Sequence, residues 1–150
     1  MMKKIDLPYL LDFVPLQDEK YTKIYPFYEN LKKGKLTTTK CKKCREILWQ
    51  PRIVCPNCLS DDLEWIELPK EGKLFAFTEM NAGAPIGFEE DIPFLIGIIE
   101  LDNVGIKILS RIEDAKYDEL DFDMKMEMKV ISLEDGRVIY RFKPSKPQLP

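Results

Sequence analysis

The chain has 150 residues, of which 45% are hydrophobic and 33% charged, a composition typical of a globular protein and unlike that of a disordered or membrane-spanning one. Its net charge of −3 and sequence pI near 5.2 argue against a general nucleic-acid binder. The chain contains no histidine, which excludes a histidine-based triad and a histidine-ligated hydrolytic metal.

The first residues carry no apolar stretch typical of a secretory signal, so we expect a cytoplasmic protein whose thiols stay reduced. The longest apolar stretch, residues 94–99, has the length of a buried strand and is far shorter than a membrane span. We therefore expect no membrane partner.

Residues 1–35 are predicted to form a helical docking segment. An apolar-rich stretch at 7–16, interrupted by two prolines, is compatible with a short helix, and a second helix is expected to begin near Tyr25 and to stop before Gly34. So many apolar side chains outside an obvious core indicate docking onto the body of the protein or onto a partner. The predicted partner-docking residues share one helical stripe and are Phe27, Tyr28 and Leu31.

The only four cysteines form two C-x2-C pairs separated by ten residues: Cys41, Cys44, Cys55 and Cys58. Two such pairs can converge on one tetrahedral metal, because each tight turn presents two thiolates. Disulfides are the alternative, and they are disfavoured by the strain of so short a loop and by the expected compartment. Zinc is the predicted metal and iron the competitor, because an all-sulfur site suits either.

Residues 36–69 are predicted to be a zinc ribbon around these cysteines, with strands at 36–40, 47–49 and 60–68. In this prediction Leu63 and Trp65 point inward, and Trp49 and Trp65 pack beside the metal-binding turns. The ribbon and the end of the preceding helix are strongly basic, with Glu46 as the only acid between residues 32 and 52. Of these cations, Arg45 and Arg52 match phosphate oxygens best, whereas a solvated charged face is the equally weighted alternative.

Residues 70–143 are predicted to form a five-stranded OB-fold barrel. Strands are expected at 73–80, 94–101 and 104–111, then at 124–130, where apolar and charged residues alternate, and after the hairpin turn Asp135-Gly136. Residues 144–150, with three prolines, are predicted to be an extended tail. The aromatic residues of the barrel strands are read mainly as core, with base stacking as the alternative: Phe75, Phe77, Tyr140 and Phe142.

The long connection after the first barrel strand is the second candidate binding element. Its small residues allow a ligand to approach the backbone, and long loops often carry function. The residues predicted to contact CoA or a partner here are Asn81, Gly83, Gly87 and Phe88. A mobile loop without a ligand is the alternative.

The combination of these motifs resembles the family named domain of unknown function 35. The resemblance rests on the aromatic helix at 25–36, the two cysteine pairs, the segment 72–78, the Pro93-Phe94-Leu95-Ile96 stretch and the closing Arg141-Phe142-Lys143-Pro144. It implies a rubredoxin-like zinc ribbon followed by an OB-fold. The sequence departs from the family where a glycine usually opens the fourth strand, since it has Asp121-Phe122-Asp123-Met124 there.

The resemblance also implies association with thiolase-type enzymes and CoA thioesters. Archaeal members are similar to a subunit that bridges acetoacetyl-CoA thiolase and HMG-CoA synthase. We accordingly expect a non-catalytic scaffold that binds acyl-CoA and such an enzyme. The alternatives that stay open are a single-stranded nucleic-acid module, an iron electron carrier and an autonomous thioesterase.

Overall fold

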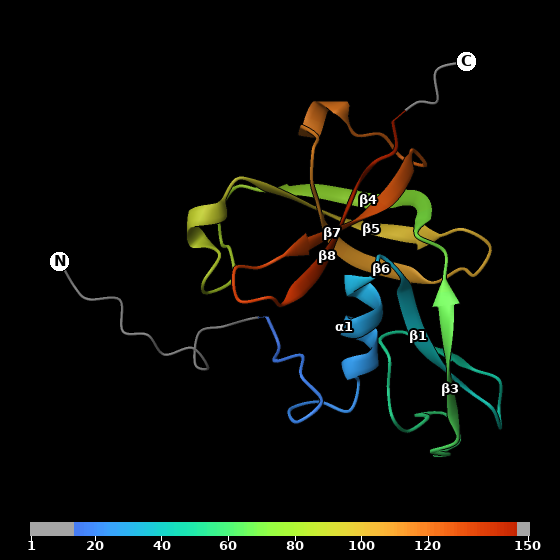
Figure 1. Cartoon of the computed structure of the whole chain (residues 1–150). Coiled ribbons are helices and arrows are strands. Elements are labelled where there is room, and N and C mark those ends of the chain that lie inside the picture. The colour runs from blue at the N-terminus through green and yellow to red at the C-terminus, as the bar shows by residue number, and fades with distance from the viewer. Residues whose placement is uncertain (1–13, 147–150) are drawn as a thin grey trace.

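A computed structural model describes residues 14–146 as a helix and two sheets. A three-stranded antiparallel sheet has the order β2-β1-β3, and a closed barrel has the order β4-β5-β6-β8-β7. In Figure 1 the barrel lies above the small sheet, and α1 lies where the two meet. The predicted mainly β fold, with a zinc-ribbon region and a five-stranded OB-fold barrel, is confirmed.

Helix α1 (Tyr25–Lys32) forms as the apolar spacing predicts. Pro26 stands in its first turn, where its missing N–H is not needed, and Gly34 follows its end with a positive φ of 75°. Of the stretch at 7–16, which was compatible with a short helix, residues 7–13 lie outside the described part of the chain, and residues 14–16 are not helical. No helix among residues 14–146 is long and apolar enough to cross a membrane.

The small sheet is built around β1, which pairs with both neighbours in antiparallel register. Three threonines of β1 are buried, and the hydroxyl of Thr38 donates a hydrogen bond to the carbonyl of Leu48. The strands of this sheet are β1 (Leu36–Cys41), β2 (Ile47–Leu48) and β3 (Leu63–Leu68).

Strands β5 and β6 alternate regularly between the interior and the outside of the barrel, as the period-two pattern predicted, and β4 departs from this at a bulge. The 3-10 turns η1 (Glu89–Asp91) and η2 (Tyr117–Glu119) lie in the β4–β5 and β6–β7 connections. In chain order the strands are β4 (Glu71–Met80), β5 (Phe94–Leu101), β6 (Lys107–Ile112), β7 (Lys125–Ser132) and β8 (Val138–Pro144).

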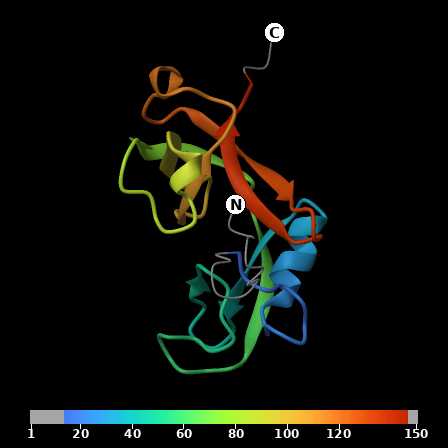
Figure 2. The same ribbon diagram turned by 90° about the vertical axis from the view of Figure 1, so that its left-hand side faces the viewer.

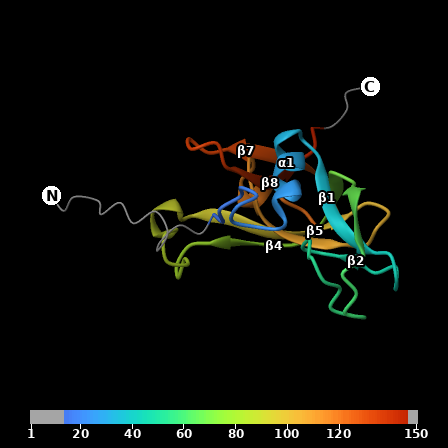
Figure 3. The same ribbon diagram turned by 60° about the horizontal axis from the view of Figure 1, so that its bottom comes forward.

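One apolar core joins the helix, the inner end of the small sheet and the barrel. Leu31 of α1, Leu36 of β1, Leu68 of β3 and Phe142 of β8 all belong to it. Figures 2 and 3 show α1 beside β1 and β8, so the helix covers the junction between the two sheets. A smaller core of Cys41, Leu48 and Cys55 lies around the sulfur atoms.

Two aromatic side chains lie elsewhere than predicted. Phe75 is 49% exposed, because it continues the outward series of Glu71 and Lys73. The register shift between Leu74 and Ala76 lets Phe77 but not Phe75 pack against the core. Trp65 is 37% exposed and does not point inward. The expectation of an inward side chain was wrong in both cases, since alternation along one strand does not reveal a bulge or what covers an outer face.

In the turn at Asp121–Met124, which lacks the glycine usual in the family, an aspartate adopts the backbone conformation that a glycine would take. Asp123 has a φ of 62°, a left-handed conformation that Asp tolerates better than most residues, and its N–H donates to Leu74 O at 2.8 Å. The departure from the family pattern therefore leaves the barrel closed.

Candidate functional site

The four cysteines lie on two turns with the same hydrogen-bond pattern. Arg45 donates its backbone N–H to Cys41 O at 3.0 Å, and Leu59 donates its backbone N–H to Cys55 O at 2.9 Å. Arg45 and Leu59 have positive φ angles of 68° and 62°, so each turn closes in the same left-handed conformation after its second cysteine. The matching turns direct four thiols toward one point.

The sulfur atoms fit a tetrahedral metal. All four Sγ atoms lie within 4.8 Å of one another, and Cys41–Cys58 and Cys44–Cys55 are each separated by 3.5 Å. A tetrahedron with metal–sulfur bonds of about 2.3 Å has sulfur–sulfur edges of about 3.8 Å. Cys41 and Cys55 are fully buried, whereas the other two cysteines are half-buried. The donor set and its spacing therefore suit Zn²⁺, which would fix both turns.

The thiols differ in acidity before any metal binds. Hydrogen bonds from the backbone at Glu46 and from the Asn57 side chain lower the pKa of Cys44 to about 6. A backbone hydrogen bond at Ser60 acts in the same direction on Cys58, but desolvation and the neighbouring sulfurs raise its pKa to about 11. Four adjacent thiolates are unfavourable without a cation, so metal binding must displace protons.

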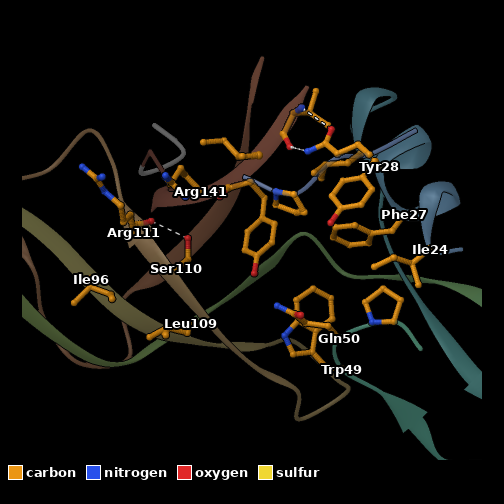
Figure 4. Close-up of a pocket in the computed structure, with 17 residues that line it drawn as sticks. Ile24, Phe27, Tyr28, Trp49, Gln50, Ile96, Leu109, Ser110, Arg111 and Arg141 are labelled. Carbon is orange, nitrogen blue, oxygen red and sulfur yellow. Dashed lines mark hydrogen bonds between the residues drawn. The ribbon is translucent and has the colours of Figure 1, made fainter. Parts of the chain in front are cut away.

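A cleft of about 610 Å³ opens between α1, the segment after β2 and the barrel strands β6 and β8 (Figure 4). One end is aromatic, and Leu109 and Ile96 form a floor of aliphatic side chains. At the other end stand the side chains of Arg111 and Arg141. The cleft therefore offers an apolar body and a cationic end.

The aromatic end is a cluster of edge-to-face contacts. The Trp49 and Tyr140 rings lie 6.1 Å apart, and Phe27 lies 6.1 Å from Trp49 and 6.5 Å from Tyr140. Burial raises the pKa of Tyr140, so its hydroxyl stays protonated at neutral pH. Trp49 therefore packs between helix and barrel, and it also borders a hollow with Pro56 and Asn57 of the second metal-binding turn, beside which it was expected to pack.

The two arginines at the cationic end are half-buried and close to each other. Arg111 donates from Nη1 to Asp91 at 2.7 Å, and its guanidinium carbon lies 4.2 Å from the Phe94 ring centroid. Arg141 Nε lies 3.6 Å from Glu113, an ion-pair distance, and no hydrogen-bond acceptor is found for it among the described residues. Burial, and then the Arg111 charge, lower the pKa of Arg141. An anion bound here would favour the charged form of Arg141 and so offset both effects.

The predicted docking residues of α1 face the protein itself. Phe27 is 6% exposed and Leu31 is 0% exposed, and both belong to the shared core. In the isolated chain these two side chains hold the barrel, which leaves little of their surface for a partner, and a docking role for this stripe stays a prediction. Tyr28 is half-buried and lines the cleft.

The other predicted binding residues lie away from this cleft. Arg45 and Arg52 are exposed on the ribbon, where Arg52 borders a smaller hollow of about 410 Å³ with Pro56 and Asn57. A role for them in phosphate or partner binding stays a prediction.

The β4–β5 loop also lies outside the cleft lining. Asn81, Gly83 and Gly87 are exposed and Phe88 is half-buried, while the two glycines have positive φ angles of 68° and 93°. Contact of this loop with a ligand or partner stays a prediction.

The sequence reasoning did not single out Arg111 or Arg141 as binding residues. Each alternates along its strand with interior residues, a pattern shared by any solvated cation. They meet only because β6 pairs with β8 in the closed barrel, at Ile112 and Phe142. No local signal in the sequence marks that pairing.

Two family models match consecutive parts of the chain. The model described as the ChsH2 rubredoxin-like zinc ribbon domain matches residues 29–64, and that described as the ChsH2 C-terminal OB-fold domain matches residues 65–130.

Individual proteins show the same likeness. A DUF35 domain-containing scaffold protein of Methanocaldococcus jannaschii is 31% identical over 116 residues, which are 73% of this chain and 81% of that protein. The benzoylsuccinyl-CoA thiolase subunit BbsA of Thauera aromatica is 27% identical over 109 residues, 69% of this chain and 72% of that subunit. A solved structure described as the Ltp2-ChsH2(DUF35) aldolase superposes with a TM-score of 0.66 at 19% identity, covering 79% of this chain and 91% of that one. This last likeness shows the fold.

Proposed function

The chain belongs to the DUF35 family, whose members join a rubredoxin-like zinc ribbon to an OB-fold, and on that premise we propose that it is a cytoplasmic, non-catalytic scaffold subunit. It binds a thiolase-type enzyme and holds an acyl-CoA for it, with HMG-CoA synthase as a candidate second partner. The observation that carries the proposal is the likeness to a scaffold protein over 81% of its length, together with that to a thiolase subunit.

Zinc has a structural part in this proposal. Cys41, Cys44, Cys55 and Cys58 hold it, and the metal fixes the ribbon, whose own core is small. The predicted division into a docking segment (1–35), ribbon (36–69), barrel (70–143) and tail (144–150) is kept as part of the proposal. A colourless purified protein with one zinc per chain supports it, and a red protein would identify the iron form instead.

The cleft supports the acyl-CoA part of the proposal. Its apolar floor suits the body of a thioester ligand, and the guanidinium groups of Arg111 and Arg141 match phosphate oxygens. The groups identified at its cationic end are suited to binding: a guanidinium stays protonated and cannot act as a general base. By holding an acyl-CoA beside a partner's active site, the subunit raises the effective concentration of the intermediate there.

Affinity capture tests the scaffold role. The tagged full-length chain, expressed in its natural source, should recover a thiolase-family enzyme identified by mass spectrometry, at a stoichiometry that survives gel filtration. The tag alone serves as the control. A chain that elutes as a clean monomer without any such enzyme would refute the proposal.

A hydrolysis assay tests the absence of chemistry. The isolated chain, incubated with acetyl-CoA or acetoacetyl-CoA, should release no free thiol above the buffer rate. Release in proportion to protein concentration would make it a thioesterase.

The exposed Phe75 favours one second candidate, a single-stranded nucleic-acid module. Its ring lies on the outer surface with Lys107 Nζ 4.0 Å from the ring centroid, a pairing of an aromatic ring and a cation that suits a base and a phosphate. An oligonucleotide titration at low salt decides: binding that weakens as salt rises supports this role, and no binding removes it.

A further inference from the structure

Strands β6 and β8 close the barrel at one point and then separate. They run parallel and pair at Ile112 and Phe142, where Glu113 donates its N–H to Phe142 O at 2.9 Å. Toward Leu109 and Val138 no further pairing joins them, and the cleft lined by both strands opens there. We call this open stretch, with Leu109, Arg111 and Tyr140, the seam.

The backbone of β6 directs every second residue's N–H and C=O toward the seam. In an antiparallel pair, successive residues direct their N–H and C=O to opposite sides. Leu101 donates to Ile106 O at 2.8 Å, so in this register the even-numbered residues of β6 bond to β5. The N–H groups of Leu109 and Arg111 therefore point into the seam.

The same reasoning applies to β8. Leu133 donates to Arg137 O at 2.7 Å, and Ser145 donates to Lys125 O at 2.9 Å, so the odd-numbered residues of β8 bond to β7. The backbone groups of Val138 and Tyr140 consequently point into the seam.

An amide group already occupies one end of the seam. The Gln17 side chain donates from Nε2 to Val138 O at 2.7 Å and accepts from Val138 N at 2.9 Å, as a neighbouring strand would. Two carbonyls farther along are partly satisfied by side chains: Ser110 Oγ donates to Arg111 O and Arg141 Nη1 donates to Tyr140 O. β6 and β8 pair at Ile112 and Phe142 alone, so the N–H groups of Leu109, Arg111 and Tyr140 point toward a stretch where these two strands are not paired.

We propose that the seam binds the pantetheine arm of a CoA thioester as a strand would bind, its amide carbonyls accepting hydrogen bonds from these backbone N–H groups. The inference rests on the acyl-CoA part of the proposed function. Pantetheine is an extended chain with two amides separated by methylene groups, so it offers the acceptors that an open strand edge lacks. Gln17 shows that an amide fits against this edge.

The side chains along the seam suit the rest of that ligand. Leu109 is 62% exposed and offers its aliphatic side chain to the apolar methyl groups of pantetheine. Arg111 and Arg141 lie at one end, where the diphosphate that follows pantetheine in CoA would meet two guanidiniums. One part of the cleft would thus bind the neutral amide chain, and the end with Arg111 and Arg141 would bind the anionic diphosphate next to it.

A proline substitution tests the backbone contact selectively. Leu109→Pro removes an N–H that points into the seam and that β5 does not use, and proline is tolerated in a strand where its missing N–H faces outward. Leu109→Ala is the matched control, since it removes the side chain and keeps the N–H. In calorimetric titrations with CoA and with pantetheine, Leu109→Pro should bind about fivefold more weakly than Leu109→Ala. Equal affinities of the two variants would overturn the inference.

Amide hydrogen exchange on the wild-type chain provides a readout that needs no variant. Pantetheine and CoA should slow exchange at Leu109, Arg111 and Tyr140, whereas adenosine 3′,5′-bisphosphate, which has no pantetheine, should not. Binding of the bisphosphate as tight as that of CoA, with no effect of pantetheine, would overturn the inference. An extended tetrapeptide that protects these amides while pantetheine does not would do the same and would identify a peptide groove.

The two proposals fail separately. Wild-type chain that captures a thiolase-type enzyme but shows no pantetheine protection removes the seam assignment and leaves the scaffold role. Failure to capture such an enzyme removes the scaffold role, whatever the seam binds.

Discussion

Replacing Leu31 by alanine should destabilise the whole molecule rather than remove a partner contact. The Leu31 side chain is 0% exposed in the core that joins α1, both sheets and Phe142. The substitution deletes three carbon atoms, about 2.4 kcal/mol of transfer free energy at about 0.8 kcal/mol for each carbon. The residual cavity adds to this, so we expect a loss of about 3–4 kcal/mol in the free energy of unfolding. For a chain of this length that corresponds to a fall in Tm of about 10 °C.

Urea unfolding of the zinc-loaded chain measures the loss. A Trp65→Phe background leaves Trp49 as the only tryptophan, and its ring lies 6.1 Å from Phe27 of α1, so its fluorescence reports on the helix–barrel junction. Leu109→Ala is the matched control: the same atoms are deleted from a side chain 62% exposed, and the change should stay below about 0.5 kcal/mol. A loss below about 1 kcal/mol for Leu31→Ala, or separate unfolding of ribbon and barrel, would refute the shared core.

Three further predictions concern the barrel, the metal and the ribbon. Gly97→Ala should lower the free energy of unfolding by about 1–3 kcal/mol, because an added Cβ would lie 2.9 Å from Ala76 O and 2.8 Å from Ile112 Cδ1. Thr78→Ala, at an exposed position of the same sheet, is the control and should change the Tm little. An unaltered Tm for Gly97→Ala would contradict this packing. Zinc affinity, measured by chelator competition, should fall as the pH is lowered from 8, because Cys58 has a pKa of about 11 before metal binds and must lose its proton. The affinity should fall more steeply below about pH 6, where Cys44 also becomes protonated. A pH-independent affinity would count against thiolate ligation. Cys55→Ser should lower the zinc content per chain and the temperature at which the ribbon unfolds. Ser60→Ala is the control and should retain the metal. Full zinc content in Cys55→Ser would exclude Cys55 as a ligand.

Local patterns in the sequence were sufficient for most of the fold. The spacing of Phe27 and Leu31, with Gly34 behind them, predicted α1, and the alternation along residues 124–130 predicted a strand there. These predictions were confirmed because both patterns follow from the helix and strand repeats themselves. Phe75 was placed wrongly because a bulge reverses the alternation, and a bulge depends on the partner strand.

The candidate sites were predictable to different degrees. The four cysteines are close in sequence and their turns are local structures, so the spacing alone anticipated that the thiols converge. Whether Phe27 and Leu31 contact a partner or the protein itself could not be predicted from local sequence patterns. An apolar stripe looks alike whether it faces a partner or the protein's own barrel, and the sequence does not say which surface covers it.

The sequence by itself determined the metal-binding turns, the order of the elements and the apolar face of each, because these depend on residues near one another along the chain. The tertiary structure alone decided that β8 lies beside β6, that Arg111 and Arg141 meet, and that three backbone N–H groups face an open seam. These features join residues about thirty positions apart, and their geometry is set by how the barrel closes. Barrel closure is a property of all five strands together, and no single segment of the sequence carries it.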